Sequence, residues 1–118
     1  AQYLLTMQYL SEMTEEQIAE AADLSTRSVQ RLRNDDTQNP SLETMIQLCI
    51  GMRLPSMISF ALIEKSGNLF KVNDLHVTYR FLINAYESQS LEFCNKFLRG
   101  QGMAVLERSA KEEKILQS

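Results

Sequence analysis

Apolar residues recur every three or four positions along most of this 118-residue chain. That spacing is typical of amphipathic helices, and no segment has the strict alternation of a half-buried strand. The sequence therefore predicts an all-α protein, built from short helices with tight connections.

Polar residues mark where the predicted helices begin. In the stretch TEEQ, Thr14 and Gln17 form a capping box, in which each side chain accepts a hydrogen bond from the other residue's backbone amide. Four later helices begin after a residue suited to the N-cap position: Ser25, Ser41, Asn73 and Ser90. Helices are expected over 3–11, from Thr14 to a break at 22–24, over 26–33, from Ser41 to Gly51, over 56–66, from Asn73, and from Ser90 to Gly100.

Gly67 is suited to the left-handed residue that follows a helix, and it marks the expected end of a first domain at residue 66. Residues 67–102 are expected to form a helical hairpin. Residues 103–118 are predicted to be a charge-rich, flexible tail with little sign of burial and a weak helix at 108–116.

The second and third predicted helices have the pattern of a helix-turn-helix, which needs a small residue where the helices cross and apolar residues at fixed offsets. The six positions to be buried are all apolar: Ile18, Ala19, Ala22, Leu24, Val29 and Leu32. The small residue at the crossing is Ala19. The third helix then exposes Thr26, Arg27, Gln30 and Arg31.

Two stretches, MTEEQIAEAADLSTRSVQRLRN and the following NPSLETMIQLCIGMRL, together resemble the phage-repressor/Cro family of helix-turn-helix regulators, also called the xenobiotic-response-element family. The resemblance covers residues 3 to about 66. It implies a five-helix repressor-like DNA-binding domain, here followed by the hairpin extension. It also implies a bacterial or phage transcriptional regulator that binds DNA sequence-specifically.

The resemblance implies that the third helix enters the major groove, with Thr26, Arg27, Gln30 and Arg31 at base edges. The chemistry agrees, because arginine pairs with guanine and glutamine with adenine through two hydrogen bonds each. The alternative is that the arginines are solvated or paired with nearby carboxylates. Phosphate contacts are expected from Thr14, Ser25, Ser28, Arg33 and Ser41, although for Arg33 a pairing with Asp35 or Asp36 is equally open.

Some positions depart from the family pattern. The first motif position, often glutamine in the family, is Glu15, so no phosphate contact is expected there. A turn position that is often glycine is Asp23, which tolerates the left-handed conformation. The loop after the third helix contains Asp35 and Asp36 where the family commonly has basic residues, which would weaken DNA binding.

Charge does not by itself favour a nucleic-acid partner. The net charge is −3, and residues 1–66 hold nine acidic and five basic side chains, a net −4. Three of those five basic residues nevertheless fall between Arg27 and Arg33. The distribution of charge matters more here than the total.

Other kinds of chemistry have little support. We expect no enzyme, metal or cofactor, because the lone His76 has no partner at metal-ligand spacing and no phosphate-binding glycine loop occurs. Cys49 and Cys94 are expected to be buried thiols. With no signal peptide and no membrane-length apolar run, a cytoplasmic protein without membrane contact is expected.

The expected partners are double-stranded DNA, a second copy of the chain and, since residue 1 is alanine, a further domain of a longer chain. Candidate dimer residues are Phe60, Leu62, Ile63, Phe93 and Phe97, each of which also fits the core. The acidic surroundings leave one main alternative, a protein-interaction or dimerisation module that has lost strong DNA affinity. A small-molecule sensor is a third reading.

Overall fold

The computed structural model describes residues 7–8, 11–34 and 39–107. Within these residues the chain is all-helical and contains no strand, as the sequence predicts. The helices are α2 (Glu15–Ala22), α3 (Thr26–Asn34), α4 (Leu42–Gly51), α5 (Ser56–Lys65), α6 (Asp74–Ala85) and α7 (Leu91–Gly100). Residues 7, 8 and 11 are also helical, while the rest of the helix predicted over 3–11 and the one at 108–116 lie outside the described residues.

The predicted N-caps are all present. The side chains of Ser25, Ser41, Asn73 and Ser90 each accept a hydrogen bond from the backbone amide three residues later, at 2.8–3.2 Å. Two helices end where the glycines predict. Gly67, just beyond α5, has the left-handed φ of 84°, and α7 ends at Gly100. Local sequence therefore determines the ends of most of these helices.

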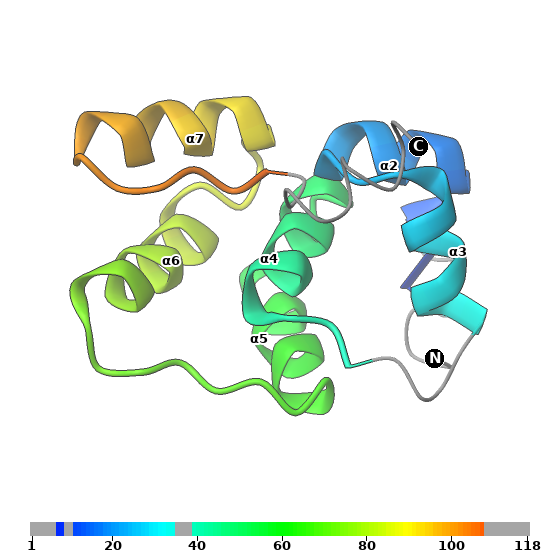
Figure 1. Ribbon diagram of the computed structural model, residues 1–118, viewed down its shortest axis with the longest axis horizontal. Coiled ribbons are helices and arrows are strands. Elements are labelled where there is room, and N and C mark those ends of the chain that lie inside the picture. Colours follow the sequence, from blue (N-terminus) through cyan, green and yellow to red (C-terminus); the bar gives the residue numbers. More distant parts are fainter. Residues whose placement is uncertain (1–6, 9–10, 35–38, 108–118) are drawn as a thin grey trace, which may run out of the picture.

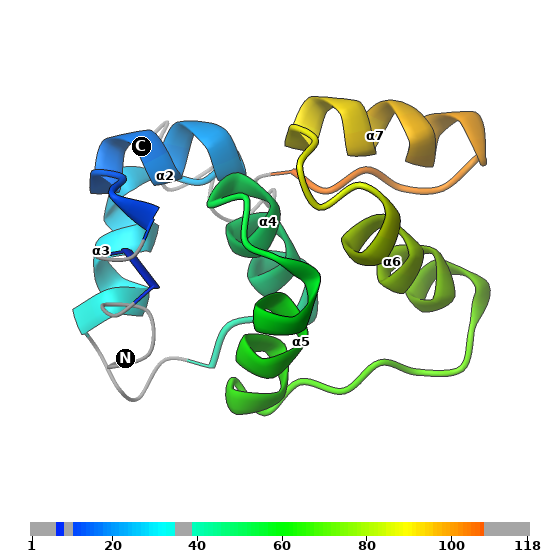
Figure 2. The same ribbon diagram turned by 180° about the vertical axis from the view of Figure 1, so that it is seen from behind.

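Helices α4 and α5 lie in the middle of the molecule, between α2 and α3 on one side and α6 and α7 on the other (Figures 1 and 2). Helix α4 packs against α2, α5, α6 and α7, and one continuous apolar core joins residues from all these helices. The core therefore runs across the boundary predicted after residue 66, which itself stays a prediction.

A polar contact also connects the residues before position 66 with those after it. The carboxylate of Glu87, in the loop between α6 and α7, accepts a hydrogen bond of 2.7 Å from the backbone amide of Ser56. This amide lies at the start of α5, where the N-cap residue is Pro55 and no side chain of α5 itself caps the helix. The carboxylate also sits at the positive end of the helix dipole, which favours the contact.

The start of the predicted tail differs from expectation. Leu106 is fully buried rather than exposed. The buried side chain of Asn95 binds the backbone of Leu106 twice, donating to its carbonyl at 2.8 Å and accepting from its amide at 2.7 Å. The charged residues that follow hid this contact, because the four apolar residues at 103–106 are too few to show a helical or strand period.

Candidate nucleic-acid interface

The site is built on the α2–turn–α3 unit, and its first element is the capping box at the start of α2. The backbone amide of Gln17 donates to the Thr14 hydroxyl oxygen at 3.1 Å, and the backbone amide of Thr14 donates to the side-chain oxygen of Gln17 at 2.9 Å. Helix α2 ends at Ala22, and its C-cap residue, Asp23, has a φ of 52° and a ψ of 52°, the left-handed conformation that the sequence allows at this turn position. The chain then turns into α3, which Ser25 caps.

The six apolar positions predicted to be buried are all buried: Ile18, Ala19, Ala22, Leu24, Val29 and Leu32. Because Val29 and Leu32 point into the core, the opposite side of α3 faces outward. The arrangement of α2 and α3 is therefore held by the apolar pattern that predicted it.

A buried polar side chain of α4 also holds the turn. Gln47 is 2% exposed, and its side-chain amide donates to the carbonyl oxygens of Ala22 at 2.9 Å and Asp23 at 3.4 Å. These carbonyls lie at the end of α2, where backbone acceptors lack a partner within the helix. This role could not be predicted from the sequence, because a glutamine among apolar residues does not reveal its partner.

The close crossing of α2 and α4 depends on Gly51. A Cβ atom at this residue would lie 2.9 Å from both the Cβ and the backbone nitrogen of Ala22. Only glycine fits without displacing α2. The sequence predicts this residue only as the exit of α4, and its role in packing is visible only in the structure.

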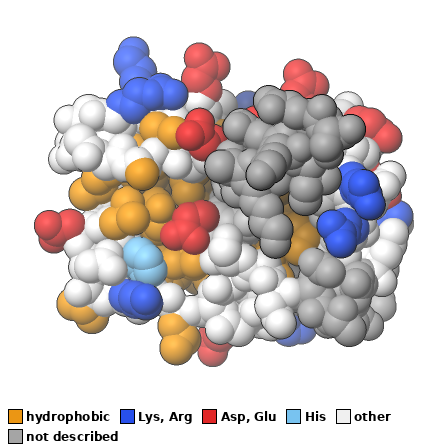
Figure 3. All heavy atoms as spheres, in the orientation of Figure 1, with side chains coloured by type: hydrophobic (Ala, Val, Ile, Leu, Met, Phe, Trp, Pro, Cys, Tyr) orange, Lys and Arg blue, Asp and Glu red, His pale blue; other side chains and the backbone are white. Residues whose placement is uncertain are grey.

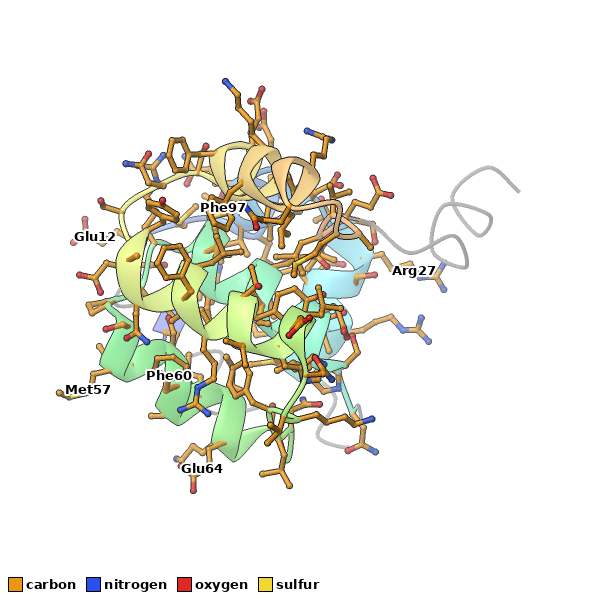
Figure 4. All side chains as sticks on the ribbon, turned by 90° about the vertical axis from the view of Figure 1, so that its left-hand side faces the viewer. Glu12, Arg27, Met57, Phe60, Glu64 and Phe97 are labelled. Atoms are coloured by element: carbon orange, nitrogen blue, oxygen red, sulfur yellow. The ribbon has the colours of Figure 1, made fainter. Side chains whose placement is uncertain are left out.

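The outer face of α3 carries the predicted base-contacting residues. Arg27, Gln30 and Arg31 are exposed, whereas Thr26 is half-buried. Within the described residues, the side chains of Arg27, Gln30 and Arg31 form no hydrogen bond or ion pair. Arg27 projects away from the body of the molecule in Figure 4, and basic side chains gather over α3 at the right of Figure 3.

Arg33 has a partner in the structure that neither reading of the sequence named. Its guanidinium pairs with the carboxylate of Glu15 and donates to the side chain of Gln8 at 2.8 Å. The Glu15 and Arg33 side chains are only 13% and 25% exposed. Arg33 therefore connects α3 to the start of α2 and neutralises the carboxylate that departs from the family pattern. Asp35 and Asp36, its other proposed partners, lie outside the described residues.

The five candidate phosphate-contacting residues separate by exposure. Thr14 and Ser41 are exposed at the first turns of α2 and α4, and Ser28 is half-buried. Ser25 is buried, and its hydroxyl donates to the Ser28 hydroxyl at 2.9 Å in addition to capping α3. The expected phosphate contact of Ser25 stays a prediction, and its buried side chain already serves the fold.

The remaining reactive side chains serve the fold. His76 accepts a hydrogen bond at Nδ1 from the Lys71 amide at 2.8 Å and stacks on Tyr79. Cys49 and Cys94 are buried free thiols, and burial raises the pKa of Cys49 to about 12 and that of Cys94 to about 11. In the described part of the chain, no three metal-ligating side chains come together to hold an ion. None of the described helices is long and apolar enough to cross a membrane.

Comparison of the chain with known protein families, curated proteins and solved structures finds no match. What the chain does is therefore inferred from its own residues and their geometry.

Proposed function

We propose that this protein binds double-stranded DNA sequence-specifically, as a regulator of transcription, with α3 in the major groove. The observation that carries the proposal is the outer face of α3. Arg27, Gln30 and Arg31 are exposed together there and make no side-chain hydrogen bond or ion pair with other described residues. The one ion pair between described residues, Arg33–Glu15, occupies one carboxylate of the α2–α3 unit.

The chemistry of these side chains suits base edges. Arg27 and Arg31 are four residues apart, so both project from one side of α3. A guanidinium presents two parallel donors to guanine, and a glutamine amide matches adenine. Each such pair contributes about 1–3 kcal/mol of discrimination between bases. Thr26, in the first turn of α3, is the fourth proposed base contact.

Phosphate contacts are assigned to the helix N-termini beside α3. Thr14 and Ser41 are exposed where α2 and α4 begin, and the backbone amides there favour anions. Ser28 is a further candidate. Arg33 is assigned a positioning role, because its pair with Glu15 fixes α3 against α2 and removes a negative charge from the proposed DNA side.

The first experiment selects the purified chain against a random-sequence duplex library at about 50 mM salt, since phosphate contacts weaken as salt rises. Any enriched site is then titrated with the parent and with Arg27→Ala and Arg31→Ala. Lys96→Ala is the matched control, because Lys96 is exposed on α7 and, unlike Arg99, does not line the cleft beside the α2–α3 turn. The chain also contains Arg53, whose guanidinium is already used by the Ser88 carbonyl and makes it a poorer control.

We expect an enriched sequence, and a loss of about 1–3 kcal/mol with relaxed base preference in each α3 variant but not in the control. Absence of enrichment, or equal binding by all variants, would refute the base contacts. In that case the alternative of a protein-interaction module with this fold would take precedence.

A further inference from the structure

A cleft opens between the second half of α5, the loop that follows it and the middle of α6. Its volume is about 340 Å³, which falls within the roughly 300–1,000 Å³ of pockets that hold small molecules. Its lining includes apolar, polar and charged side chains: Phe60, Glu64, Asn68, Leu69, Phe70 and Arg80. These six residues define what we call the α5–α6 cleft.

The cationic group of the cleft is Arg80, and two aromatic rings hold it in place. Its guanidinium carbon lies 5.9 Å from the centre of the Phe60 ring and 5.4 Å from that of Phe70. Such contacts attract the guanidinium but use none of its N–H donors in conventional hydrogen bonds. Arg80 forms no hydrogen bond or ion pair with another described residue. Its planar donors therefore remain available, and they match the geometry of a carboxylate.

Two oxygen acceptors line the same cleft. The exposed carboxylate of Glu64 forms no ion pair with Arg80 or with any other described residue. The Nδ2 atom of Asn68 donates to the Pro40 carbonyl and to the Ser66 hydroxyl, both at 2.9 Å. These bonds fix the side-chain amide, while its Oδ1 atom accepts no hydrogen bond within the described part of the chain. A carboxylate and an amide oxygen together suit an ammonium group, which has three donors.

We propose that the α5–α6 cleft binds a free α-amino acid with a large apolar side chain, such as leucine or phenylalanine. The ligand's carboxylate pairs with Arg80, and its ammonium group meets Glu64 and Asn68 Oδ1. Its side chain packs against Phe70 and covers Leu69, which is 79% exposed. Large apolar side chains left in water in this way often mark a binding site.

The two charges of the cleft select a zwitterion over simpler ligands. A plain carboxylate that reached Arg80 would lie beside the negative charge of Glu64, and like charges disfavour binding. A plain amine would pair with Glu64 but leave the donors of Arg80 without an anion. An α-amino acid supplies both charges on neighbouring atoms, so it satisfies both residues from one position.

The loop side of the cleft is held in place by contacts with α6. The backbone amide of Lys71 donates to Nδ1 of His76 at 2.8 Å. The ring of His76 meets that of Phe70 edge to face at 6.4 Å and stacks on Tyr79 at 5.6 Å. A wall that is ordered before the ligand arrives lowers the entropy cost of binding.

This proposal does not rest on DNA binding. In Figure 4, Phe60 and Glu64 lie on the other side of the molecule from Arg27. A small ligand in the α5–α6 cleft therefore leaves the outer face of α3 uncovered, and its binding is measured on the chain alone.

The test is isothermal titration calorimetry of the purified full chain with four probes. L-Phenylalanine carries all three recognised groups, whereas phenethylamine lacks the carboxylate, 3-phenylpropanoate lacks the ammonium group and glycine lacks the apolar side chain. We expect phenylalanine to bind about fivefold or more tightly than each of the other probes, a modest factor because water screens both exposed charges.

Two variants assign the charges of the ligand to their partners. Arg80→Gln should abolish the preference for phenylalanine over phenethylamine, and Glu64→Gln should abolish the preference for phenylalanine over 3-phenylpropanoate. Lys96→Gln, which removes a charge from the exposed surface of α7, is the matched control and should keep both preferences. A general loss of structure would not produce these opposite selectivities, and circular dichroism checks that each variant keeps the parent's helix content.

Several results would overturn the proposal. They are no heat of binding for phenylalanine at millimolar concentration, equal affinity for all four probes, or unchanged preferences in both variants. Tighter binding of 3-phenylpropanoate than of phenylalanine would also overturn it, by showing a site for simple anions. A chain that binds no probe but still selects a DNA sequence would overturn it while leaving the proposed function intact.

Discussion

The close crossing of α2 and α4 gives a test of the scaffold that holds α3. Replacing Gly51 by alanine places a methyl group 2.9 Å from the Cβ and backbone nitrogen of Ala22 and 3.0 Å from its Cα. Two of these three atoms belong to the backbone of α2, so a side-chain rotation cannot relieve the overlap. Helices α2 and α4 must move apart.

Two effects of this substitution oppose each other. Alanine favours a helix over glycine by about 1 kcal/mol in its interior, and by less at the last residue of α4. Overpacking a tight core costs about 1–3 kcal/mol. Because the overlap involves backbone, we expect the packing cost to dominate, with Gly51→Ala less stable by about 1–2 kcal/mol. For a chain of this size the melting temperature should fall by about 5–10 °C.

Gly100→Ala is the control, because Gly100 is also the last residue of its helix but a Cβ atom added there would meet no atom within 4 Å. It should gain helix propensity without a clash and match or exceed the parent's stability. Urea unfolding followed by circular dichroism measures all three proteins. Equal stability of Gly51→Ala and Gly100→Ala would refute the steric account of the α2–α4 crossing.

Three further predictions concern polar and titratable groups. Gln47→Glu should lower the free energy of unfolding at pH 7 by about 1–3 kcal/mol, because a carboxylate would face two carbonyl oxygens. This loss of stability should shrink on acidification, because the protonated carboxyl group can donate a hydrogen bond to one of them. Glu87→Ala should cost about 1 kcal/mol by removing the acceptor for the Ser56 amide, measured by urea unfolding against Glu87→Gln, which retains an acceptor. Burial raises the pKa of Cys49 from 9.0 to about 12 and that of Cys94 from 9.0 to about 11. The unfolded chain therefore loses these protons first as the pH rises above 9, so the folded state should become less stable there. A thiol reagent should label both residues only after unfolding. Rapid labelling of the folded chain at neutral pH would contradict the burial of these thiols.

Features encoded by neighbouring residues were predictable from the sequence. The capping box at Thr14 and Gln17 and the left-handed turn at Asp23 each depend on local backbone chemistry, and each is present. The apolar spacing also identified the buried side of α3, which left Arg27 and Arg31 on its exposed side. One face of a helix follows from the other, so these positions required no knowledge of the tertiary structure.

Contacts between distant residues were not predictable in the same way. Gln47 lies 25 residues from Ala22, whose carbonyl it binds, and Glu87 lies 31 residues from Ser56. Arg33 pairs with Glu15, which lies 18 residues before it in the sequence. A polar side chain has several chemically acceptable partners, and only the packing of the helices decides among them.

The position of α4 connects these distant contacts to the proposed function. One end of α4 holds the α2–α3 turn through Gln47 and the Gly51 crossing, while the same helix also packs against α5, α6 and α7. Helices α6 and α7 therefore support the helix that supports the turn. A protein that reads DNA by a few side chains of α3 needs that helix held rigidly, because each base contact depends on the position of its side chain. If α3 reads DNA as proposed, α6 and α7 contribute to the orientation of Arg27 and Arg31 through α4.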